Sequence, residues 1–340
     1  MNLRNFNFTP LPPIEPTPQS APPSDPDPLG PLALLPGRWV GQGFNMIWRP
    51  FFELGGTQNH FLELNLTDET IDFAPIGGNI PNRGLLQPDL FMTGITYLQA
   101  VNDHNLSTPQ APYGLHAEPG VWLNVPATSD PQEPATVVRM GSIPHGTAIV
   151  AQGTATQFDH APPIGPVPPP YPAPIDIATG QPVPQPESNL DFATPYRSSG
   201  QQVDGIVQAM IDDPVAYFLT GPLAQQTVLT NVTLAVFTNN ASDPDTPVSA
   251  GGGTANTAFL VGAADGPNAN ASEVQSTFWI EQIQGENGAP DFLQLQYRQL
   301  VFLDFAGLRW PHVSVATLIK QPDAAAATGL GGLAAVAGSP

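Results

Sequence analysis

Short apolar runs, each broken by Gly, Pro, Asn or Asp, fill the chain from Leu32 to about Thr156. Strands of this length and spacing are typical of an antiparallel sandwich or barrel, because the breaking residues favour turns between them. The runs predict strands at residues 37–48, 61–66, 70–73, 94–101, 120–125, 136–140 and 147–152.

Three more strands are predicted near the end of the chain, at residues 274–283, 292–305 and 312–320. In the middle one, Leu293, Leu295 and Tyr297 alternate with Gln294, Gln296 and Arg298. Alternation with a period of two places one set of side chains on a buried face and the other on the opposite face. The pattern therefore predicts an all-β fold, and we expect an antiparallel β-barrel.

Residues 157–273 separate these two groups of strands and are expected to form a long insertion. Proline is dense over 161–187, which favours an extended path over a surface. A short helix is predicted where Val203, Ile206, Val207, Met210 and Ile211 recur at helical spacing, before Asp213-Pro214 begins another turn. We interpret this helix as a packed flap. Residues 227–238 predict a strand, and residues 239–273 predict a long loop.

The predicted organisation has four parts. Residues 1–31 form a Pro-rich tail, residues 32–156 and 274–320 form the barrel domain, residues 157–273 form the inserted segment, and residues 321–340 form an Ala/Gly-rich tail. We expect both tails to be poorly ordered, because their composition offers few large apolar side chains to bury.

The composition of the chain excludes several classes of binding partner and of chemistry. The chain has 340 residues, with 29 acidic against 9 basic side chains and a formal net charge of −20. Nucleic acids and anionic membranes are bound through clustered Lys and Arg, so this balance argues against both. The chain has no cysteine, which excludes disulfides, thiolate catalysis and Cys-ligated metals. No secretory signal is visible after Met1, and we expect a cytoplasmic protein. Self-association into a homo-oligomer stays open, because the sequence says little about assembly.

Six histidines are the strongest metal ligands available: His60, His104, His116, His145, His160 and His312. None belongs to an HExxH, HxH or i, i+4 pattern, so a zinc site made only of protein ligands is not predicted. The sequence also lacks a G-x-S-x-G elbow and a phosphate-binding glycine loop with its lysine. Hydrolase and nucleotide-dependent functions are therefore not supported.

A β-barrel can hold one small ligand, and a haem needs only a single axial imidazole from the protein. His312 is the best placed histidine for this role, because it opens the last predicted strand. Its alternate neighbours Ser314, Ala316 and Leu318 are small or apolar and leave room for a flat ring on that face.

Several segments resemble the nitrobindin family of haem-binding β-barrels. The run from Gly37 to Gly43, with Trp39 and Gly41, resembles the opening G-x-W-x-G-x-G motif. The later landmarks follow in the family's order: Tyr97-Leu98-Gln99, the H-x-E-x-G sequence from His116 to Gly120, the Pro144-His145-Gly146 segment, and Leu295-Gln296-Tyr297 followed by the strand that begins at His312. The resemblance covers residues 32–155 and 274–320, about half of the chain.

The resemblance implies a ten-stranded barrel with haem b at its mouth and His312 as the proximal iron ligand. It implies chemistry on nitric oxide or peroxynitrite, and a peroxidase-like reaction is a close variant. His145 and His116 are the histidines to test as catalytic acid–base groups. Trp39, Phe44 and Trp48 are aromatic packing residues that are also candidates to line the cofactor cavity, and Arg49 is a candidate partner for the haem propionates.

The residues themselves leave two alternative functions open. The same barrel could carry a small hydrophobic ligand without catalysis, because an apolar pocket with a few polar contacts needs no titrating group. Alternatively, residues 157–273 could form an interface for a protein partner.

Overall fold

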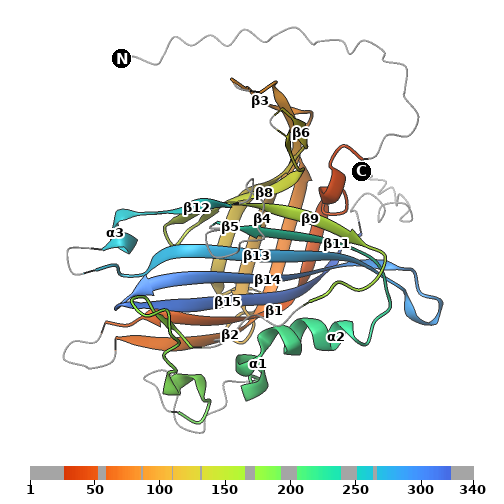
Figure 1. Ribbon diagram of the computed structural model, residues 1–340. Coiled ribbons are helices and arrows are strands. Elements are labelled where there is room, and N and C mark those ends of the chain that lie inside the picture. The colour runs from red at the N-terminus through yellow and green to blue at the C-terminus, as the bar shows by residue number, and fades with distance from the viewer. Residues whose placement is uncertain are drawn as a thin grey trace, which may run out of the picture.

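Ten strands form the wall of a closed antiparallel barrel (Figure 1). The computed structural model describes residues 27–52, 59–85, 87–108, 110–130, 132–164, 173–192, 205–238, 251–262 and 266–322. Within them, the wall consists of β1 (Gly37–Pro50), β2 (His60–Pro75), β4 (Leu90–Asp103), β5 (Gly114–Val125), β8 (Thr136–Ile143), β9 (Thr147–Phe158), β11 (Val228–Phe237), β13 (Asn270–Ile283), β14 (Phe292–Phe305) and β15 (Leu308–Lys320). They are adjacent in this order, and β15 pairs with β1 to close the wall. The expected ten-stranded antiparallel barrel is confirmed.

The apolar core fills one end of the barrel. Trp39, Tyr97, Phe278 and Leu295 point inward there, because alternate residues of each strand face the lumen. The 3₁₀ turn η2 (Gly30–Leu32) covers this end, and the side chain of its last residue, Leu32, is fully buried. Residues 27–31 were expected to belong to a tail. They instead include the first two residues of η2, whose buried Leu32 extends the core. Residues 1–26 lie outside the described residues.

A helical cover packs on the outer face of β1, β2, β14 and β15. It consists of α1 (Gln208–Asp212), η4 (Ala216–Thr220) and α2 (Gly221–Leu223), and Figure 1 shows it lying along β1 and β15. Ile211 and Leu219 are fully buried against an outer row that includes Phe44, Val313 and Val315. Burying one such side chain stabilises the fold by about 1.5–3 kcal/mol. The predicted helix is confirmed in part: it packs against the barrel, but α1 begins at Gln208, so Ile206 and Val207 precede it, and Val203 lies outside the described residues.

The segment 157–273 does not lie wholly outside the barrel, which corrects the expected boundary. β11 fills the place between β9 and β13, with Leu234 and Val236 completely buried in the lumen. Without β11 the wall would have an unpaired gap, so this strand is part of the closure. The predicted loop at 239–273 is also wrong in part. This range contains three elements: β12 (Gly251–Asn256), α3 (Ala258–Val261) and the beginning of β13. β12 pairs with β9.

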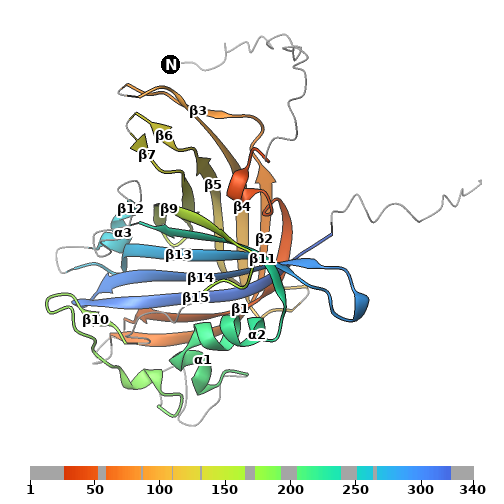
Figure 2. The ribbon, with the colours of Figure 1, turned by 45° about the vertical axis from the view of Figure 1, so that its right-hand side comes forward.

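Smaller elements lie around the barrel. β3 (Ile80–Asn82) pairs with β4, and β6 (Thr128–Ser129) pairs with β7 (Gln132–Glu133); Figure 2 shows these hairpins projecting from the barrel. The proline-rich segment contributes β10 (Ile175–Asp176) and η3 (Pro186–Ser188), and η5 (Glu286–Gly288) joins β13 to β14. All helices in the described ranges are short, and none has the length and apolar composition needed to span a membrane.

Candidate functional site

Three of the six histidines gather at the end of the barrel opposite η2, where His60 lies separately on the outer face beside Trp48 and Trp310. His312 on β15 is the register partner of Ile47 on β1 and of Val301 on β14. His116 lies on β5, and His145 lies in the turn between β8 and β9. The centroids of the His116 and His145 rings are 5.8 Å apart, at an interplanar angle of 28°. Both rings influence the protonation of His312, so all three lie within electrostatic range of one another.

His312 faces the lumen. Its alternate neighbours Ala316 and Leu318 belong to the inner core, whereas Val313 and Val315 pack on the outer face. Burial, followed by the nearby His116 and His145, lowers the pKa of His312 to about 3. The side chain is half-buried. Its imidazole is therefore neutral at physiological pH and faces the inside of the barrel.

His116 is oriented by a carboxylate on its own strand. Its Nε2 lies 3.4 Å from Oε2 of Glu118. Burial alone would raise the pKa of Glu118, but the Arg139 guanidinium and the hydrogen bond with His116 outweigh it and hold that pKa at about 2. An ionised carboxylate can only accept, so Nε2 of His116 carries the proton. In the neutral form of this imidazole the other ring nitrogen, Nδ1, carries the lone pair.

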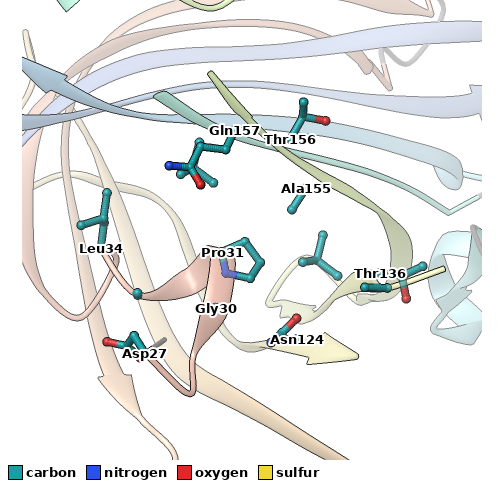
Figure 3. Close-up of a pocket in the computed structure, with 13 residues that line it drawn as sticks. Asp27, Gly30, Pro31, Leu34, Asn124, Thr136, Ala155, Thr156 and Gln157 are labelled. Carbon is teal, nitrogen blue, oxygen red and sulfur yellow. The ribbon is translucent and has the colours of Figure 1, made fainter. Parts of the chain in front are cut away.

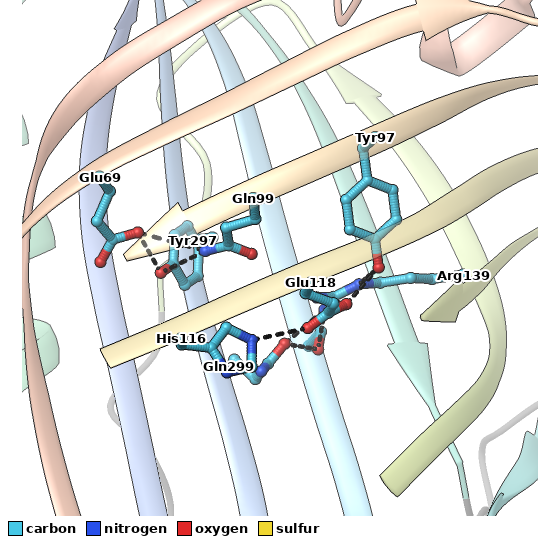
Figure 4. A network of polar contacts seen from close by, with 9 residues as sticks. Glu69, Tyr97, Gln99, His116, Glu118, Arg139, Tyr297 and Gln299 are labelled. Atoms are coloured by element: carbon cyan, nitrogen blue, oxygen red, sulfur yellow. Dashed lines mark hydrogen bonds and ion pairs between the residues drawn. The ribbon is translucent and has the colours of Figure 1, made fainter. Parts of the chain in front are cut away.

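Glu118 belongs to a buried network that crosses the lumen (Figure 4). Arg139 Nη2 donates to Glu118 Oε1 at 2.7 Å, and Arg139 Nε donates to the Tyr97 hydroxyl at 3.1 Å. Arg139 Nη1 donates to Ser276 Oγ at 2.8 Å and to Gln299 Oε1 at 2.6 Å. The Tyr97 hydroxyl also donates to Glu118 Oε1. One guanidinium thus joins four strands of the wall.

The pKa of a second lumen carboxyl group, that of Glu69, is shifted in the opposite direction. Tyr297 donates its hydroxyl proton to Glu69 Oε2 at 2.6 Å, and Thr67 donates to Glu69 Oε1 at 2.7 Å. Gln99 Nε2 donates to the Tyr297 hydroxyl at 3.0 Å. Burial raises the pKa of Glu69, and the hydrogen bonds from Tyr297, Thr67 and Gln99 together with the charge of His116 offset this only in part. The pKa values of the two lumen carboxyl groups are therefore shifted in opposite directions.

Glycines on the inner face make room for this network. A Cβ on Gly120 would lie 2.5 Å from ring atoms of Tyr97, and a Cβ on Gly141 would lie 2.4 Å from Glu118 Oε1. On β1, a Cβ on Gly43 would lie 2.8 Å from Glu69 Oε1. These positions explain why glycine recurs in strands that otherwise carry large side chains.

Replacing Gly120 with alanine is expected to destabilise the fold by about 1–3 kcal/mol, because the added methyl group forces Tyr97 out of its position. Chemical denaturation followed by tryptophan fluorescence measures the change. Gly253→Ala is the matched control, since a Cβ at Gly253 would meet no atom within 4 Å. Equal stabilities for the two variants would contradict this account of the inner glycines.

The structure separates the predicted aromatic site residues from the histidines. Trp39 lies in the core at the other end of the barrel, where its Nε1 donates to the Leu35 carbonyl at 2.8 Å. Phe44 and Trp48 point to the outer face beneath the helical cover. The expectation that these three line a lumen cavity beside His312 does not hold, because strand alternation and distance along β1 direct them elsewhere.

Arg49 lies at the histidine-bearing end, near the rim. It pairs with Glu63 on β2, and its guanidinium lies 5.0 Å from the centre of the Phe61 ring. The charges of Arg49 and Glu63 both act on His145. The His145 ring also hydrogen-bonds to the Leu115 backbone, while burial and the neighbouring His116 lower its pKa. His116, His145, His312 and Arg49 are thus brought to one end of the barrel.

Arg139, Glu69 and Tyr297 are network members that the sequence analysis did not select. The only available signal for Arg139 was a single charge within the apolar run 136–140. Alternation along its strand places Tyr297 on the inner face, but its contact with Glu69 joins strands far apart in the chain and has no local signal. Their roles follow from the closure of the barrel.

A pocket of about 580 Å³ lies at the η2 end, between that turn and β5, β8 and β9 (Figure 3). Figure 3 shows Pro31 and Leu34 facing Asn124, Thr136 and Gln157. Asp27 is its one acidic lining residue, and Asp27 Oδ1 already accepts from the Leu29 amide at 2.8 Å. The pocket has no histidine and stands apart from the histidine-bearing end.

No group of three or more metal-ligating side chains is present among the described residues. Comparisons with protein-family models, curated proteins and solved structures found no match for this chain.

Proposed function

We propose that the histidine-bearing end of the barrel binds haem b through the imidazole of His312, and that the bound iron acts on nitric oxide, peroxynitrite or peroxide. The observation that carries this proposal is the neutral, lumen-facing imidazole of His312, which has no hydrogen-bond partner among the described residues. A histidine held in this way keeps a nitrogen lone pair available for a metal.

The surrounding wall suits a large apolar ligand. Val301 beside His312 is 5% exposed, and Ile143, Ile149 and Val274 form an apolar cluster with it. These side chains point into the lumen from β8, β9, β13 and β14, so they offer an apolar face to a porphyrin. A bound haem would supply iron for ligand binding and redox chemistry, with its properties tuned by the axial imidazole.

The chain itself supplies an acid–base group near His312. Glu118 fixes the proton of His116 on Nε2, which leaves Nδ1 to accept a proton from a group in the lumen. The ionised carboxylate then stabilises the imidazolium that forms, and Arg139 keeps that carboxylate in place. His145, stacked beside His116, is the second candidate for this role.

Titration of the purified full-length protein with hemin tests the proposal. We expect a shifted Soret band at one equivalent, and we expect His312→Ala to lose it. His104→Ala is the matched control, because His104 is exposed and pairs with Asp68 outside the lumen. The loaded protein should also speed the decay of peroxynitrite or peroxide relative to free hemin.

A mixture that shows only the spectrum of free hemin would contradict haem binding, and an unchanged band in His312→Ala would contradict the ligand assignment. A barrel that carries a small hydrophobic ligand without catalysis is the second candidate, favoured by the same apolar cluster. It would bind a fluorescent lipid equally well with or without His312.

A further inference from the structure

Two buried asparagines on the lumen wall have carbonyl oxygens without a hydrogen-bond partner. Asn45 on β1 and Asn65 on β2 are direct register partners. Asn45 is 4% exposed and Asn65 is 8% exposed, yet the Oδ1 atoms of both are unpartnered. Buried acceptors are almost always satisfied in folded proteins, so an adjacent unsatisfied pair calls for an explanation.

The side chains of both residues face inward. On β1, Phe44 and Met46 on either side of Asn45 pack on the outer face. On β2, Leu64 and Leu66 do the same on either side of Asn65. Strand alternation therefore turns the two amides into the lumen.

The orientation of the Asn65 amide is fixed. Its Nδ2 donates to Asp103 Oδ2 at 2.9 Å. Asp103 Oδ1 in turn accepts from the backbone amides of Asn105 and Leu106, each at 2.8 Å. Because the carboxyl group of Asp103 holds the nitrogen of Asn65, the oxygen of Asn65 must point away from it. This acceptor therefore has a fixed direction and no donor within the described residues.

The surroundings favour a donor that carries positive charge. Asp103 receives hydrogen bonds from amides and forms no ion pair with any residue in the described ranges. Glu63 and Glu118, two other carboxyl groups near the lumen, each pair with an arginine. A carboxyl group behind an amide polarises it and strengthens the amide oxygen as an acceptor.

The inner wall of the barrel carries a polar row on one side and an apolar cluster on the other. Ser314 on β15 is the register partner of Asn45, so a polar row runs from β15 across β1 to β2. The apolar cluster of Ile143, Ile149, Val274 and Val301 comes from β8, β9, β13 and β14. A ligand that fits has a hydrogen-bond-donating head and a hydrocarbon body.

We propose that the Oδ1 atoms of Asn45 and Asn65 form a binding site for the primary ammonium group of a small amphipathic amine, whose hydrocarbon part lies against the apolar cluster. An ammonium group offers three donors and no acceptor, which matches two preorganised acceptors near a carboxyl group. This site uses different atoms from the iron ligand proposed above and does not depend on haem.

Calorimetric titration of the haem-free full-length protein with n-hexylammonium, n-hexanol and n-hexanoate tests the site. We expect n-hexylammonium to bind most tightly and n-hexanoate most weakly, since the acceptors and Asp103 disfavour an anion. Asn45→Leu should weaken n-hexylammonium binding by at least about tenfold, because a charge-assisted hydrogen bond is lost. Asn82→Leu on β3 is the matched control and should bind as the parent does, since Asn82 is exposed outside the barrel wall.

A stability measurement separates ligand binding from a structural role. Asn45 makes no side-chain hydrogen bond within the described chain, so Asn45→Leu should be at least as stable as the parent. Loss of stability in Asn45→Leu, with no n-hexylammonium binding to the parent, would mean that structural water alone occupies these acceptors and would overturn the proposal. Equal affinity for n-hexanoate would overturn it too. These titrations contain no hemin, so their outcome is independent of the Soret result.

Discussion

Replacing Arg139 with methionine is expected to destabilise the barrel by about 3–5 kcal/mol, because it leaves the Glu118 carboxylate buried without its cation. Arg139 is 1% exposed and also contacts Ser276 and Gln299 across the lumen. Chemical denaturation followed by tryptophan fluorescence measures the loss, and Trp122 is a suitable reporter since the guanidinium lies 5.9 Å from its ring.

The double variant Glu118→Gln with Arg139→Met should recover part of this loss, because removing both charges of a buried pair costs less than removing one. Arg38→Met is the surface control. Its partner Asp72 is half exposed, so we expect a change below about 1 kcal/mol. A double variant as unstable as the single one would show that lost packing, rather than the unpaired carboxylate, causes the effect.

Replacing Glu281 with glutamine is expected to stabilise the protein at alkaline pH. Glu281 is fully buried on the outer face of β13, where Gln294 Nε2 donates to its Oε2 at 2.8 Å. Gln294 also pairs with Gln226, just beyond α2, so the helical cover closes over this carboxyl group. Burial raises the pKa of Glu281 to about 8, and the Gln294 hydrogen bond opposes this only in part.

The sign of the pH dependence follows from that raised pKa. The folded state holds a proton on Glu281 that the unfolded state releases near its ordinary pKa of 4.5. The contribution of this group to stability is therefore complete below pH 4.5, falls as pH rises, and is lost by about pH 8. With about 1.4 kcal/mol per pKa unit, the shift from 4.5 to about 8 means that Glu281→Gln gains on the order of 5 kcal/mol at pH 8.5 and little at pH 4.

Urea denaturation of Glu281→Gln and the parent across pH 4–9 measures this difference. Glu286→Gln is the control, because it makes the same charge change at an exposed position in η5. We expect the free energy of unfolding of Glu286→Gln to change with pH as it does in the parent. Parallel slopes for all three proteins would contradict a protonated Glu281 under the helical cover.

Local patterns predicted much of the wall. The alternation of Leu293, Leu295 and Tyr297 placed β14 at the residues where the structure has it, 292–305. The same period put His312 on the face of Ala316 and Leu318, which do lie in the inner core. It was less informative for Phe44 and Trp48. Large aromatic residues suit a lumen and a covered outer face equally well, and only the helical cover decided which face they occupy.

The site depended on contacts that no local pattern carries. Gln99 and Tyr297 are 198 positions apart and share a hydrogen bond of 3.0 Å in the lumen. Arg139 and Gln299 are 160 positions apart, at 2.6 Å. Such pairs are set by the register of ten strands around a closed wall, which includes β11 from a segment that we expected to lie outside the barrel.

The sequence by itself determined that this chain forms antiparallel strands, where most of them lie, and that His312 faces the small and apolar side of its strand. Each of these properties follows from a period of two along one segment. The tertiary structure alone decided that His116 and His145 lie near His312, that Arg139 neutralises Glu118, and that Asn45 meets Asn65. These contacts arise because closing the barrel brings distant strands into one lumen.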